Sequence, residues 1–152
     1  MKLFKTLILL CTIFFLFFLV SCTEEGFERE LSRAEILSGD DAEGRSYFIS
    51  SAEIDLFELN GTIILDECVT DNTIRYFPGG RYTENEGSTT CNPTDPPGDT
   101  GTWILSDDET QLTITVFGVT NVWDIVSIDN DGHRITRASQ DGQITYIFDR
   151  FL

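Results

Sequence analysis

The chain has 152 residues, with 10 Lys and Arg against 26 Asp and Glu, which gives a formal net charge of −16 at pH 7. This length fits one domain, since about 150 residues per domain is usual. The negative charge argues against a nucleic-acid partner, because binding to phosphates needs a basic surface. The only histidine is His133, so metal sites built on several histidines are excluded.

The first 21 residues are typical of an export signal. Lys2 and Lys5 precede an almost unbroken apolar run, Leu7–Val20. Its 14 residues match the length of a signal-peptide core, whereas a membrane-spanning helix usually needs about 17–25 apolar residues. The alternatives are an uncleaved N-terminal membrane anchor and plain secretion.

The stretch Leu19-Val20-Ser21-Cys22 resembles the bacterial lipobox, in which small residues precede a lipidated cysteine. We therefore predict a lipoprotein: cleavage after residue 21, a diacylglycerol on Cys22, and a lipid anchor in the outer membrane of the cell envelope. Thr23-Glu24-Glu25 resembles the acidic signal that sends some lipoproteins to the cell surface. An ordinary polar tether would look the same.

The chain after the signal has 8 Arg, no Lys and 26 acidic residues, a formal charge of −18. Such a surface favours solubility and disfavours contact with anionic membranes. The acidity fits either a solvated surface or weak divalent-cation binding. The turn beginning at Asp129 suggests a calcium loop, but His133 and Gln140 stand at its fifth and twelfth positions, so the pattern fails. We expect no metal and no cofactor.

Two cysteines remain after Cys11 leaves with the signal and Cys22 is acylated. In an exported domain, Cys68 and Cys91 are expected to form one disulfide. A metal site is the weaker alternative, because neither cysteine has a neighbouring second cysteine.

Residues 22–44 form an acidic tether in this interpretation, with a short helix expected around Phe27–Leu37. From residue 45 to residue 152 the pattern indicates β-structure. In Gln111–Phe117, for example, Leu112, Ile114 and Val116 share one face and alternate with Thr113, Thr115 and Phe117 on the other. Short strands joined by tight turns predict an all-β fold, an eight-stranded antiparallel up-and-down barrel that closes on itself. The predicted strands are Tyr47–Phe57, Ile74–Phe77, Arg81–Glu86, Thr102–Ser106, Gln111–Phe117, Val122–Ile128, His133–Ala138 and Ile144–Phe151.

Two further local predictions concern loops. Cys91–Thr100 is rich in proline and is interpreted as a stiff loop, held at one end by the disulfide. Asp131-Gly132 is typical of a type I′ hairpin turn, in which both central residues have positive φ. His133, directly after this turn, is expected to be a solvated surface residue and not a general base.

The order of several short motifs resembles the small lipocalin-like domains of bacterial lipoproteins. These motifs are Asp66-Glu-Cys68, Asp71-Asn72, Tyr76-Phe77 with Gly79-Gly80 and Tyr82, Cys91, Gly101-Thr-Trp103 and Trp123-Asp-Ile125. The resemblance covers about residues 45–152. It departs at the first strand, where Tyr47 or Phe48 stands in place of an expected Trp. It implies a β-barrel with a pocket for a small apolar molecule, but no particular ligand.

The chain contains no Gly-x-Ser-x-Gly motif, no phosphate-binding glycine loop and no free thiol once the disulfide forms. With 26 acidic residues, a carboxylate pair at glycosidase spacing carries no specificity. We therefore expect a monomer that is not an enzyme. Tyr82, Trp103 and Trp123 are the predicted ligand-binding residues, although each fits plain core packing equally well.

Two hypotheses of function remain at this point. The first is a lipid-anchored binding protein whose barrel holds a small apolar ligand. The second is a surface interaction module with a filled barrel that binds a protein partner through its acidic loops. An internal cavity would favour the first, and a filled interior the second.

Overall fold

The computed structural model describes residues 29–56, 59–94, 96–139 and 142–151. The predicted export signal, Cys22 and the acidic pair after it lie outside the described residues. Within the described residues, no helix is both long and apolar enough to cross a membrane. The part from Leu31 to Leu152 is one compact unit.

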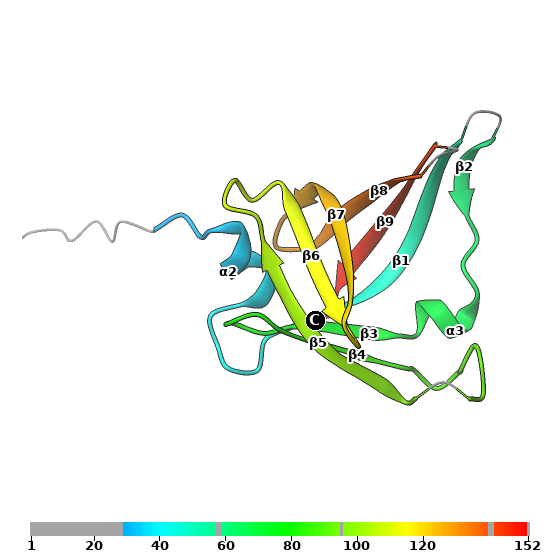
Figure 1. Ribbon diagram of the computed structural model, residues 1–152, viewed down its shortest axis with the longest axis horizontal. Coiled ribbons are helices and arrows are strands. Elements are labelled where there is room, and N and C mark those ends of the chain that lie inside the picture. Colours follow the sequence, from blue (N-terminus) through cyan, green and yellow to red (C-terminus); the bar gives the residue numbers. More distant parts are fainter. Residues whose placement is uncertain (1–28, 57–58, 95, 140–141, 152) are drawn as a thin grey trace, which may run out of the picture. The chain divides into compact units, whose positions relative to one another are not determined.

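This unit is a closed eight-stranded antiparallel β-barrel, as the alternation of the sequence predicted (Figure 1). Most strands pair with their sequence neighbours, and the ring closes where β1 pairs with both β3 and β9. The barrel strands are β1 (Arg45–Leu56), β3 (Thr73–Tyr76), β4 (Arg81–Asn85), β5 (Gly98–Leu105), β6 (Gln111–Val116), β7 (Val119–Ile128), β8 (Gly132–Ser139) and β9 (Gly142–Arg150).

A ninth strand, β2 (Leu59–Ile63), was not predicted. It pairs only with the second half of β1, from Ala52 to Leu56, and so extends the sheet beyond the ring.

The prediction of a loop over Cys91–Thr100 was wrong at its end. Gly98 to Thr100 belong to β5 and pair with Asn85 to Thr83 of β4, because the chain is free to join a ladder as soon as Pro97 is passed.

Two short helices lie at opposite ends of the barrel (Figure 1). The helix α2 (Arg33–Ser38) is shorter than the predicted stretch and begins with a capping box between Ser32 and Glu35. Its Leu37 is fully buried in the barrel core. The helix α3 (Glu67–Thr70) lies at the other end and carries Cys68. We call these ends of the barrel the α2 end and the α3 end.

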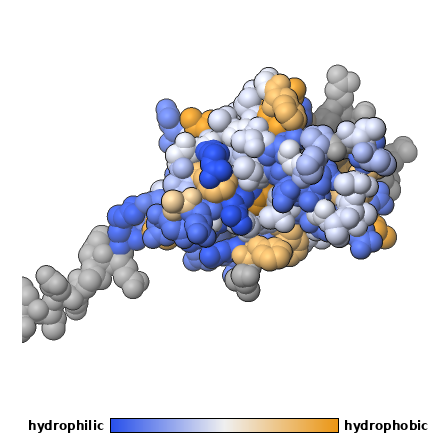
Figure 2. Space-filling view, turned by 90° about the horizontal axis from the view of Figure 1, so that it is seen from below, coloured by the Kyte–Doolittle hydropathy of each residue, from blue (hydrophilic) through white to orange (hydrophobic). Residues whose placement is uncertain are grey.

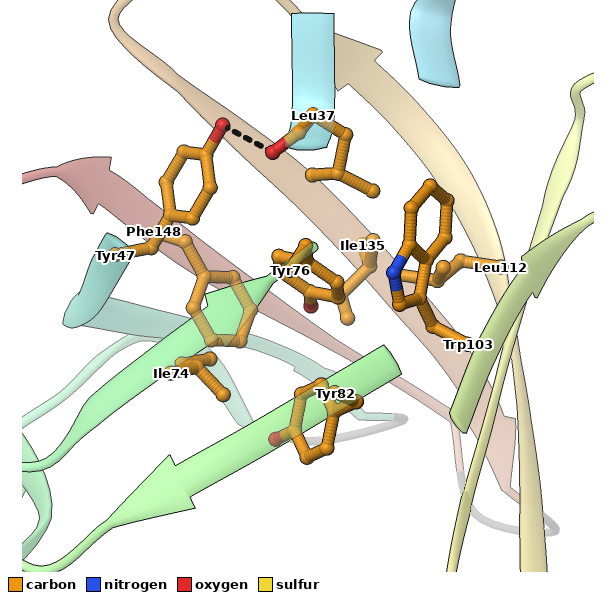
Figure 3. Packing of buried hydrophobic residues seen from close by; sticks show 9 residues of the cluster. All are labelled: Leu37, Tyr47, Ile74, Tyr76, Tyr82, Trp103, Leu112, Ile135 and Phe148. Carbon is orange, nitrogen blue, oxygen red and sulfur yellow. Dashed lines mark hydrogen bonds between the residues drawn. The ribbon is translucent and has the colours of Figure 1, made fainter. Parts of the chain in front are cut away.

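The core at the α2 end is built on aromatic side chains (Figure 3). Tyr76 is fully buried, and its ring lies 5.8 Å from that of Tyr47 and 5.7 Å from that of Trp103. The Tyr47 hydroxyl donates a hydrogen bond of 3.0 Å to the carbonyl oxygen of Leu37, which ties α2 to β1. Of the two residues at which the resemblance departs, Tyr47 is therefore the one buried in the core, while the adjacent Phe48 is only half-buried.

The predicted type I′ turn at Asp131-Gly132 was wrong. Neither residue is among the described residues with positive φ. Instead, the Asp129 carboxylate accepts hydrogen bonds from the backbone N–H groups of Asp131 and Gly132. Positive φ at two successive residues is found between β6 and β7, at Phe117 (51°) and Gly118 (77°). Phe117 is therefore an exposed turn residue and not the last residue of a strand.

Candidate functional site

The barrel contains a cavity of about 390 Å³. All eight barrel strands and α3 contribute to its wall. Apart from Glu84, Asp99 and Asn121, the lining is apolar or aromatic: Ile49, Val69, Ile74, Tyr76, Tyr82, Ile114, Val116, Trp123, Ile135, Tyr146 and Phe148. A volume of this size and a mostly apolar lining with a few polar groups are typical of small-molecule sites.

Aromatic rings cover two parts of the cavity wall. On one part, Trp123 and Tyr146 meet edge to face, with ring centroids 5.5 Å apart. On another, the rings of Tyr76 and Tyr82 lie 5.5 Å apart. Such edge-to-face and tilted contacts hold the rings in place while leaving their remaining surface to the cavity.

Two carboxylates, Glu84 and Asp99, lie on adjacent strands and are direct partners in the β4–β5 register. One oxygen of Glu84 accepts a hydrogen bond of 3.2 Å from the Tyr82 hydroxyl. The Oδ1 atom of Asp99 is buried and has no hydrogen-bond partner. Burial raises the pKa of Glu84, and the negative charges of Asp99 and Glu86 raise it further, against the Tyr82 hydrogen bond, which lowers it.

The α3 end is held by α3 and the loop between β4 and β5. The predicted disulfide is confirmed: Cys68 and Cys91 are bonded, with their Cα atoms 5.1 Å apart. Asp71 accepts a hydrogen bond of 2.9 Å from the backbone N–H of Thr89, and Asn72 one of 3.0 Å from that of Gly87. The bridge and these bonds fix the loop beside the cavity.

The three predicted ligand-binding residues do not lie together. Tyr82 and Trp123 line the cavity, whereas Trp103 does not. Trp103 is buried in the core, and its indole N–H donates a hydrogen bond of 3.0 Å to the carbonyl oxygen of Phe77. Trp103 also borders a hollow of about 730 Å³ outside the barrel, between α2 and β5. That hollow is lined largely by turn residues, without the aromatic walls of the cavity.

His133 is not a solvated surface residue, so that prediction was wrong. Its side chain is 2% exposed and stacks on Phe148, with ring centroids 4.4 Å apart. The reason is strand register: His133 pairs with Phe148 of β9, and both side chains point into the barrel. Burial lowers the pKa of His133 to about 3. Among the described residues, no cluster of three or more His, Cys, Asp or Glu is arranged to hold a metal ion.

Sequence reasoning did not predict Glu84, Asp99 or Asn121 as site residues. Glu84 could have been found, because strand alternation places it on the same face as Tyr82. Asp99 could not, since it fell in the segment interpreted as a proline-rich loop. Asn121 lay in the predicted gap between two strands, where no inward face can be assigned.

Comparison with known proteins places the fold in the lipocalin-like class of small β-barrels. A solved structure of a lipocalin-like protein from Bacteroides uniformis is similar to this chain, with a TM-score of 0.50 and 10% sequence identity. The similarity covers 76% of this chain and 99% of that one. Neither protein-family models nor curated proteins give a match. The predicted lipocalin-like barrel is thus confirmed at the level of fold.

Proposed function

We propose that this chain is a lipid-anchored envelope lipoprotein whose barrel binds a small, largely apolar molecule. The observation that carries the proposal is the cavity of about 390 Å³ inside a closed barrel, with aromatic side chains in its wall. Aromatic and aliphatic side chains left facing an open cavity forfeit packing contacts, which a ligand of suitable size would restore. The cavity also weighs against the hypothesis of a filled barrel.

The lipid anchor rests on the lipobox-like Leu19–Cys22 alone, and the acidic pair after it supports export to the cell surface. The disulfide fits an oxidising compartment outside the cytoplasm. The surface shown in Figure 2 is mostly hydrophilic, with separate hydrophobic patches, as suits a domain tethered in water. We propose a monomer that acts without nucleic acid, metal or cofactor.

The proposed function is not enzymatic. A histidine base must reach the substrate proton, and His133 is enclosed by the rings of Tyr47, Tyr76 and Phe148. The low pKa of His133, about 3 because of burial, also leaves it neutral at pH 7.

A pair of matched substitutions tests ligand binding. Val116 lines the cavity, so Val116→Phe should occupy part of the volume. Val122 is 45% exposed on β7, so Val122→Phe adds the same bulk without filling the cavity. The neutral, apolar fluorescent probe N-phenyl-1-naphthylamine should bind the wild type and Val122→Phe, but not a folded Val116→Phe. Native mass spectrometry of the wild type should also reveal a co-purified small molecule.

Two results would contradict the proposal. One is equal probe binding by Val116→Phe and Val122→Phe, which would place the probe outside the barrel. The other is no binding by the wild type together with no co-purified molecule, which would leave the interaction-module hypothesis. Circular dichroism of each variant checks that the barrel is folded.

A further inference from the structure

We infer that the molecule bound in the barrel carries a positive charge, as an ammonium or another organic cation at one end of an apolar or aromatic body. This inference rests on the proposed function and specifies the ligand of the same cavity. Its basis is the pair Glu84 and Asp99, two acidic residues in the wall of an otherwise mostly apolar cavity.

The two carboxylates are unusual because they face one another on adjacent strands. Glu84 and Asp99 are register partners, and the negative charge of Asp99 adds to burial in raising the pKa of Glu84. Like charges placed opposite each other on neighbouring strands destabilise a sheet. Among the groups that act on Glu84, the charged ones are Asp99 and Glu86, and both are negative. A bound cation would relieve this repulsion.

The hydrogen bonding of the pair leaves room for a donor. The Tyr82 hydroxyl reaches one oxygen of Glu84, while Oδ1 of Asp99 is buried without a partner. A buried carboxylate oxygen is costly unless it accepts a hydrogen bond. An ammonium group carries several N–H donors and would supply both the missing bond and the missing charge.

The rest of the cavity suits the body of such a ligand. Cations bind over the faces of Trp and Tyr rings, and aromatic cages recognise ammonium groups in this way. Tyr82 lies beside the carboxylates, and Trp123 and Tyr146 lie in the same wall. Arg137 has its guanidinium carbon 5.8 Å from the centroid of the Trp123 ring and donates a hydrogen bond to Asn121. The guanidinium of Arg137 is thus hydrogen-bonded to β7, and it is not among the charged groups that act on Glu84.

The test uses three probes with the same aromatic body and different charge: 2-phenylethylamine, 2-phenylethanol and 3-phenylpropionate. Binding to the purified protein at pH 7 is followed by calorimetry and by tryptophan fluorescence. The amine should bind about tenfold more tightly than the alcohol, and the carboxylate more weakly than either. In Glu84→Gln and in Asp99→Asn, the amine should lose most of its advantage over the alcohol.

The control is Glu43→Gln, which removes the same charge from an exposed side chain between α2 and β1, at the α2 end. It should leave the preference for the amine unchanged. Amine and alcohol binding with equal affinity, or a preference that survives in both carboxylate variants, would overturn the inference and leave the apolar-ligand proposal standing. Binding of none of the three probes would contradict both. Thermal melting of each variant confirms that it is folded.

Discussion

The hydroxyl oxygen of Tyr76 lies 3.4 Å from Nε2 of His133, and both side chains are buried in the barrel core. Burial raises the pKa of Tyr76 far above its usual value and lowers that of His133 to about 3, so both groups are neutral. The Nδ1 atom of His133 is buried and has no hydrogen-bond partner. A histidine in this position ties the stability of the barrel to pH.

We expect acid to destabilise the barrel through His133. In the unfolded chain its pKa is about 6.5, so between pH 6.5 and 3 the unfolded chain binds a proton that the folded chain does not. Stability contributed by this group is therefore present above pH 6.5 and lost as the pH falls. The loss between pH 7 and pH 5 should be about 2 kcal/mol. Urea unfolding at both pH values, compared with His133→Phe, isolates this contribution, and equal pH dependence in the two proteins would contradict it.

Removal of the disulfide should destabilise the domain. The bond between Cys68 and Cys91 closes a loop with a sequence separation of 23 residues. The chain-entropy model gives about 3.5 kcal/mol for a loop of this length. Urea unfolding of a Cys68→Ala, Cys91→Ala double variant should show a loss of about 2–5 kcal/mol. Peptide mapping without reductant should recover both cysteines in one fragment, and free alkylation of both in the native protein would refute the bridge.

The two tryptophans should differ in their effect on stability. Trp103 is 7% exposed and hydrogen-bonded in the core, so Trp103→Ala should cost about 3–5 kcal/mol. Trp123 is only partly buried and borders the cavity, so Trp123→Ala should cost about 1–2 kcal/mol. Only the Trp123 variant should also change the binding of an apolar probe. A full core-sized loss for Trp123→Ala, with no probe binding by the wild type, would favour the interaction module.

A side chain at Gly101 should not be tolerated. A Cβ atom there would collide with the carbonyl oxygen of Thr115 on β6. Gly101→Ala should therefore force the β5–β6 ladder apart and cost about 2 kcal/mol or more. Gly61 on β2 offers the matched control, because a Cβ there would meet nothing within 4 Å. Gly61→Ala should change the midpoint of thermal unfolding little, and similar losses in both variants would contradict the steric explanation.

Lipidation is expected at Cys22. Growth with an alkyne-bearing fatty acid should label the protein in a host that processes lipoproteins, and Cys22→Ala should abolish the label. Cys11→Ala provides a control, since that cysteine is expected to leave with the predicted signal. Label that persists in Cys22→Ala would reject the lipid anchor. A labelled protein that also resists extraction by salt would support attachment to the membrane.

Much of the barrel could be predicted because strand alternation is local. Leu112, Ile114 and Val116 were assigned to one face, and all three pack in or against the core. The disulfide followed equally simply, since only Cys68 and Cys91 are left once the predicted signal is removed and Cys22 is assigned to lipidation. The barrel prediction needed only the order of residues along the chain and the rule that apolar side chains leave water. The disulfide prediction also needed the expected export of the domain to an oxidising compartment.

The inner surface of the barrel was decided by tertiary structure alone. Whether an inward side chain meets a neighbour or an open cavity depends on how eight strands close and stagger, which involves contacts between residues far apart in sequence. For this reason His133 was assigned to the surface, although pairing with Phe148 buries it. The pairing of Glu84 with Asp99 could not be predicted from the sequence either, because the two residues face each other only when β4 and β5 are placed in register.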